Sequence, residues 1–120
     1  MILTESEVQQ VLEQVKIAFP NLTDWEYNNE DNGEYDGFSV WGKFILNPEE
    51  MMYQTFFITI DIYRDKWRGY LTTGQPSYYW SSTDEQDAYL ISTEPCESRE
   101  EAIAQLKAEI LRLFQAFSIV

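Results

Sequence analysis

Residues 54–72 read QTFFITIDIYRDKWRGYLT, and this stretch decides the fold. In its first half, apolar side chains recur at every second position, as they do in a strand that buries one face. The positions expected to face inward are Gln54, Phe56, Ile58, Ile60 and Ile62. Arg64 and Asp65 interrupt the alternation, and a second extended run follows at 66–72. The stretch therefore predicts two antiparallel strands joined by a tight turn.

Further strands are predicted on both sides of this hairpin. Residues 22–27 alternate apolar with polar side chains, residues 47–50 read as a turn, and residues 88–92 form one more short run. A longer run before the turn has an inward set of Phe38, Val40, Gly42, Phe44 and Leu46. Residues 74–87 are mostly turn formers around Tyr78, Tyr79 and Trp80, which fit a hairpin core or an exposed recognition patch. Short links between neighbouring strands predict an antiparallel meander of four to five strands.

A helix is predicted at each end of the meander. Thr4 and Glu7 have the spacing of a capping box, and Pro20 ends the helix that follows over residues 4–19. Ser98 and Glu101 have the same spacing before the second helix. Its apolar stripe consists of Ile103, Leu106, Ile110, Leu113, Phe114 and Phe117. These elements predict a single α+β domain over residues 1–120, with both helices packed on one face of the sheet.

The composition excludes several classes of function. The chain has 120 residues, 21 acids and 8 bases, and its net charge of −13 repels nucleic acid and anionic membrane. Its 16% aromatic content is typical of a folded protein and not of a disordered acidic tail. There is no apolar run near the ~20 residues that span a bilayer, and the N-terminal residues lack the pattern of a signal peptide. We expect a cytoplasmic protein that binds neither nucleic acid nor membrane.

Catalytic chemistry has little support in the sequence. Histidine is absent, which removes the usual general base and nearly all zinc chemistry. Cys96 is the only cysteine and lies in the acidic stretch EPCES, where neighbouring carboxylates should raise its thiol pKa. We therefore expect that the protein is not an enzyme.

The candidate site is the acidic stretch WEYNNEDNGEYDGFSVW, residues 25–41. Six carboxylates lie within residues 24–36, and each close pair costs on the order of 1 kcal/mol in repulsion. A hard cation removes this cost, and calcium accepts six to eight oxygen ligands in a tolerant geometry. The candidate ligands are Asn28, Glu30, Asp31, Asn32, Glu34 and Asp36.

The spacing of these ligands matches an EF-hand loop only in part. Counted from Asn28, Gly33 stands at the sixth position, where that loop has its sharp turn, but Ser39 stands at the twelfth, where glutamate is needed. The flanks are also predicted strands, so the stretch is not an EF-hand. A second acidic run contains Asp84 and Asp87, which could complete the first site or simply belong to the solvated surface.

The length, the acidity and the stretch NNEDNGEYDG, residues 28–37, give the chain a resemblance to the small acidic calcium-binding proteins of cyanobacteria. The resemblance implies an α+β fold and a calcium buffer without EF-hands. It also implies that a loop aspartate and main-chain carbonyls hold the ion. Here the aspartate would be Asp36, and the carbonyls would come from residues 37–40, including Phe38 and Val40.

Two other interpretations of the acidity remain open. The loop could be a solvated surface that improves solubility and protects a sheet edge from pairing. Alternatively, the protein could be an inhibitor or immunity protein whose acidic face covers a basic partner, because charge of this size steers association with cationic surfaces.

Overall fold

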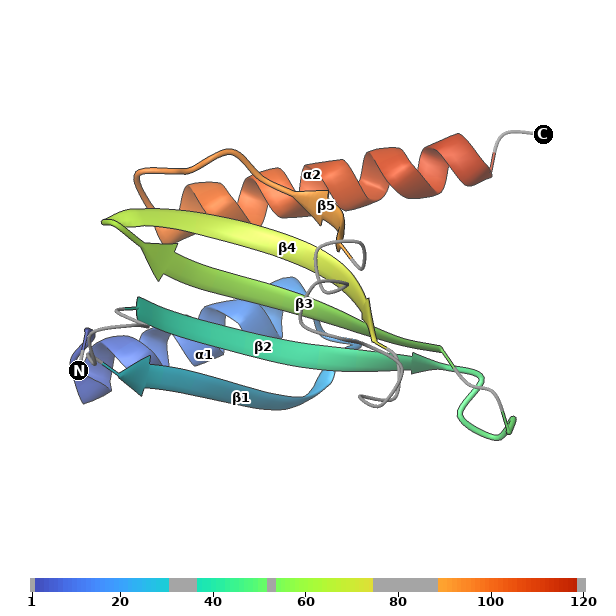
Figure 1. The fold of residues 1–120 in the computed structure, drawn as a ribbon, viewed down its shortest axis with the longest axis horizontal. Helices are drawn as coiled ribbons and strands as arrows, with labels where there is room; N and C mark the ends of the chain where they lie inside the picture. Colours follow the sequence, from blue (N-terminus) through green and yellow to red (C-terminus); the bar gives the residue numbers. More distant parts are fainter. Residues whose placement is uncertain (1, 31–36, 52–53, 75–88, 119–120) are drawn as a thin grey trace.

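The structure, a computed structural model, describes residues 2–30, 37–51, 54–74 and 89–118. Helix α1 (Glu5–Ala18) precedes the strands and helix α2 (Arg99–Phe117) follows them. The strands are β1 (Thr23–Glu30), β2 (Gly37–Leu46), β3 (Gln54–Tyr63), β4 (Lys66–Gly74) and β5 (Tyr89–Ser92). They form one sheet in the order β1-β2-β3-β4-β5, with every neighbouring pair antiparallel (Figure 1). The predicted α+β meander with terminal helices is confirmed.

The hairpin of β3 and β4 has the predicted two-residue turn. Tyr63 pairs with Lys66, and the intervening Arg64 and Asp65 have φ angles of 53° and 65°. Positive φ at both central residues is typical of the hairpin turns whose twist matches that of the flanking strands. Every later pair along the two strands follows from this turn, up to Thr55 opposite Gly74.

Both helices pack on the same face of the sheet and share one core. Alternate residues of the central strands, among them Phe38, Val40 and Ile60, are fully buried. Val11 of α1 and Leu106 of α2 belong to the same buried cluster. Figure 1 shows α1 behind β1 and β2, while α2 runs along β4 and β5. The opposite face of the sheet has no helix among the described residues.

The helix starts follow the predicted caps. The Thr4 hydroxyl accepts the N–H of Glu7 at 3.1 Å, and the Glu7 carboxylate accepts the N–H of Thr4 at 3.0 Å, which completes the first capping box. Ser98 Oγ accepts the N–H of Glu101 at 3.1 Å, which is the hydroxyl half of the second.

Two of the predicted inward faces are covered only in part. Phe44 and Leu46 in β2, and Phe114 and Phe117 in α2, are exposed. The physical reason is length: the end of β2 extends past α1, and the last turns of α2 extend past β4 and β5 (Figure 1). The predicted aromatic cluster at 78–80 lies outside the described residues.

Candidate functional site

The described part of the predicted calcium site is the end of the β1–β2 hairpin. Asn28 pairs with Ser39, Asn29 with Phe38 and Glu30 with Gly37. Pairing therefore continues to the last residue described on each strand, and six residues connect them. Four predicted ligands, Asp31, Asn32, Glu34 and Asp36, belong to that connection and lie outside the described residues, as do Asp84 and Asp87.

Strand alternation places Asn28 and Asn29 on opposite faces of the sheet. Asn28 and Glu30 are exposed, and their positions in β1 place them on the helix-free face of the sheet. Asn29 is on the opposite face, opposite the buried Phe38. Its Oδ1 accepts the N–H groups of Ile2 and Leu3 at 2.9 and 3.0 Å, and its Nδ2 donates to the Leu3 carbonyl at 2.8 Å. Asn29 therefore anchors the N-terminal segment, while Asn28 and Glu30 lie on the opposite face of β1.

The main-chain ligands implied by the resemblance lie in β2. The side chains of Phe38 and Val40 are fully buried in the core. Both residues pair with β1 on one side and with β3 on the other. Carbonyls in such a strand serve as acceptors in the sheet ladder. Within the described ranges, no group of three or more acidic, cysteine or histidine side chains lies close enough to hold a metal ion.

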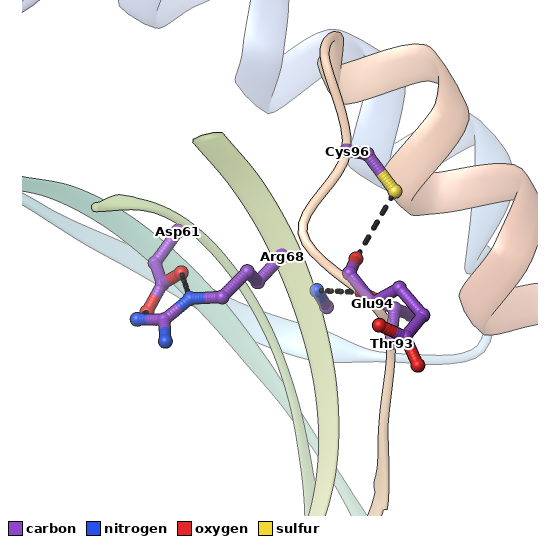
Figure 2. A network of polar contacts seen from close by, with 6 residues as sticks. Asp61, Arg68, Thr93, Glu94 and Cys96 are labelled. Atoms are coloured by element: carbon purple, nitrogen blue, oxygen red, sulfur yellow. Dashed lines mark hydrogen bonds and ion pairs between the residues drawn. The ribbon is translucent and has the colours of Figure 1, made fainter. Parts of the chain in front are cut away.

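A second feature is a shallow hollow of about 630 Å³ on the helix-free face. It is lined by Thr59, Asp61, Arg68, Tyr70, Thr72 and Tyr89. Asp61 and Arg68 are directly opposite each other across the β3–β4 pair. Arg68 Nε and Nη2 donate to the two Asp61 carboxylate oxygens at 3.2 and 3.3 Å. Figure 2 shows this pair on one side of β4, with Thr93, Glu94 and Cys96 on the other.

The aromatic part of the hollow adjoins this ion pair. The Arg68 guanidinium lies 5.3 Å from the centre of the Tyr70 ring, and the Tyr70 and Tyr89 rings are 5.4 Å apart. Burial raises the pKa of Asp61, and the Arg68 charge opposes that shift. Burial also raises the pKa of Tyr70 to about 12, with a smaller contribution from the Asp61 charge. Tyr70 is therefore a protonated hydroxyl at neutral pH, and the hollow offers hydrogen-bonding groups and aromatic surface.

Sequence reasoning did not single out these residues, although one signal was present. A two-residue turn at Arg64 and Asp65 fixes the register of β3 against β4, and that register places Asp61 opposite Arg68. The alternation of each strand then assigns both residues to the helix-free face.

Cys96 has a structural environment. It is buried, and its main chain forms a two-way hydrogen-bonded bridge with Trp67, at N–O distances of 2.7 and 2.8 Å. Its Sγ donates to the Glu94 carbonyl at 3.2 Å (Figure 2). Burial is the main cause that raises the pKa of its thiol, and the charges of Glu101 and Glu94 add to it. The predicted direction is confirmed, with burial ahead of charge as the cause.

Comparison of the chain with protein-family models, with curated proteins and with solved structures gives no match. Among the described residues, neither helix combines the length and the apolar character that crossing a membrane requires.

Proposed function

We propose that the protein binds calcium at the connection between β1 and β2 and acts as a buffer of free calcium, not as a catalyst. The observation that supports this most is the pairing of Glu30 with Gly37. It ties both ends of a six-residue connection together, since Cα atoms of paired residues are about 5 Å apart. Asp31, Glu34 and Asp36 all belong to that connection, and Glu30 stands at its start.

Tied ends limit how far these carboxylates can separate. Each close pair of like charges costs on the order of 1 kcal/mol at a protein surface. A calcium ion replaces that repulsion with attraction, and it tolerates an irregular set of carboxylate, amide and water oxygens. Magnesium requires a stricter octahedron and gives up its water less readily, so a short acidic connection favours calcium.

The proposed ligands come from the connection and from the exposed face of β1. Glu30 and Asn28 lie on the same face of β1, and Asp31, Asn32, Glu34 and Asp36 follow them in the sequence. Asn29 is excluded because its amide already binds Leu3. The carbonyls of Phe38 and Val40 are not required, because six side-chain ligands precede them.

The test is titration calorimetry of the chelator-treated protein with calcium and, separately, with magnesium. We expect a calcium dissociation constant below about 1 mM and weaker magnesium binding. Asp36→Asn should weaken the calcium site by about tenfold, which corresponds to ~1.4 kcal/mol. Glu50→Gln is the matched control, because Glu50 is an exposed acid in the turn at the opposite end of β2. Absence of calcium binding up to millimolar concentrations would overturn the proposal.

A second candidate is an acidic protein that covers a basic partner. Lys43, Lys66, Arg68, Arg99 and Arg112 each form an ion pair with a carboxylate of the same chain. With 21 acids and 8 bases, even complete pairing leaves a large excess of negative charge. When a cell lysate is passed over the immobilised protein, one basic protein should be retained at about 50 mM salt and released at about 500 mM. Retention of many unrelated proteins, or of none, would contradict this candidate.

A further inference from the structure

The apolar stripe of α2 is longer than the surface on which it packs. Ile103, Leu106, Ile110, Leu113 and Phe117 follow the alternating spacing of three and four residues that is typical of helix–helix packing. Ile103 and Leu106 are buried, and Leu106 Cβ lies 3.1 Å from where a Cβ on Gly69 would stand. Ile110 and Leu113 are half-buried against the core. From Leu106 to Phe117 the helix advances about 16 Å, and burial decreases along this length until Phe117 is exposed.

The exposed end presents the same side of the helix as the buried start. At 3.6 residues per turn, Phe114 lies about 20° from Ile103 around the helix axis, and Phe117 lies about 20° from Leu106. Yet Phe114 is 62% exposed and Phe117 is 80% exposed. Leu111, at the margin of the stripe, is also exposed. Contiguous apolar side chains of this size on a surface mark an interaction site, whereas single ones do not.

The charge of this region indicates which partner fits. The last acid of α2 is Glu109, which forms an ion pair with Arg112 at 3.0 Å. From residue 110 to residue 118 the chain carries no acid. The chain as a whole has a net charge of −13, which opposes approach of anionic membranes and of other copies at its acidic surfaces. The end of α2 is therefore a surface where two copies can meet without carboxylates facing each other.

We propose that the exposed end of α2 pairs with the same segment of a second copy in an antiparallel, two-fold symmetric contact. A two-fold axis between residues 113 and 114 places Phe114 opposite Leu113 of the second copy. The same axis places Phe117 opposite Ile110 of the second copy. Each exposed aromatic ring thereby covers a half-buried aliphatic side chain, as a self-complementary interface requires.

The contact spans only about two turns of each helix, so it is smaller than a stable interface of about 1,200–2,000 Å². We therefore expect a dimer whose population rises with protein concentration and whose dissociation constant is micromolar or weaker. Added salt should strengthen it, because salt screens repulsion between the acidic chains while the apolar contact persists. This salt response is opposite to that expected for capture of a basic partner.

The test is sedimentation equilibrium from about 5 to 500 µM protein, at about 50 and 500 mM sodium chloride. We expect the average mass to rise from 14.2 kDa toward twice that value, and to rise further at high salt. The double variant Phe114→Gln/Phe117→Gln should remain monomeric under all these conditions. Ile17→Gln is the matched control, since Ile17 is 74% exposed on α1, and it should behave like the wild type.

Three results would overturn the inference. One is a wild-type mass that stays at that of the monomer throughout the range. Another is a double variant that associates as strongly as the wild type. The third is growth beyond the dimer, because a two-fold contact closes on itself. Circular dichroism of each variant checks that the substitutions, which are at exposed positions, leave the fold intact.

Discussion

Asn29 holds Leu3 through both ends of its side-chain amide. Oδ1 accepts the N–H of Leu3 at 3.0 Å, and Nδ2 donates to the carbonyl of the same residue at 2.8 Å. The amide thus pairs with the main chain of Leu3 as a neighbouring strand would. This contact places the start of the chain against β1, and Leu3 itself is part of the buried cluster.

Removal of that amide should cost measurable stability. We expect Asn29→Ala to lower the free energy of unfolding by about 2 kcal/mol, because it leaves partly buried main-chain groups without partners. Asn28→Ala, one residue earlier on the exposed face, should change it by less than about 0.5 kcal/mol. Urea unfolding of the two variants measures the difference. Equal effects would show that the contact with Leu3 does not stabilise the fold.

The close approach of α2 to β4 at Gly69 gives a second prediction. A Cβ at this position would lie 3.1 Å from Leu106 and 3.2 Å from Ile60. Gly69→Ala should therefore destabilise the protein by about 1–3 kcal/mol through overpacking.

A double-mutant cycle identifies the cause of that loss. Leu106→Ala removes the side chain that the new methyl group would meet, so the cost of Gly69→Ala should shrink in that background. If the two losses simply add, the crowding lies elsewhere.

The carboxyl groups of Glu7 and Asp61 should change the free energy of unfolding in opposite directions as the pH falls. The N–H of Thr4 is the main cause that lowers the pKa of Glu7. A lowered folded-state pKa contributes stability at pH values above the unfolded pKa, and that contribution is lost as the pH falls through the folded value. Burial raises the pKa of Asp61, so the folded state takes up this proton at a higher pH than the unfolded chain does. The contribution of Asp61 to stability therefore decreases as the pH rises through the interval between these two values.

Two variants separate these effects. From about pH 6 down to pH 3, the stability advantage of the wild type over Glu7→Gln should shrink. Over the same range, the wild type should gain stability relative to Asp61→Asn. Urea unfolding at several pH values provides both comparisons. If the free energy of unfolding changes with pH in parallel for the wild type and both variants, the pKa shifts of Glu7 and Asp61 are refuted.

The sequence allowed prediction of the elements more fully than of their limits. Alternation in residues 54–62 predicted β3, and the Arg64–Asp65 turn determined its partner strand. The period of α2 correctly assigned Phe117 to the side of Leu106, but period alone does not say where the supporting sheet ends. Phe117 was therefore expected in the core and is exposed.

For the candidate site, the sequence predicted which residues could bind calcium but not on which face of the sheet they lie. The high density of side-chain oxygen ligands in residues 28–36 is evident from the sequence alone. The placement of Asn28 and Asn29 on opposite faces of the sheet was not predicted, because β1 was predicted to end at Tyr27. Only the extension of β1 to Glu30 places Asn28 and Glu30 together and directs Asn29 to Leu3.

Calcium binding is tested most directly by thermal unfolding of the chelator-treated protein with calcium, with magnesium at equal concentration, and with neither. A ligand at one hundred times its dissociation constant stabilises the folded state by about 2.7 kcal/mol. In a chain of this length that corresponds to roughly 10 °C in the melting temperature. We predict such a rise with calcium, reversed by chelator and absent in Asp36→Asn, and a much smaller rise with magnesium, which controls for charge screening. Melting curves that are the same with calcium and with magnesium would contradict calcium binding at the β1–β2 connection.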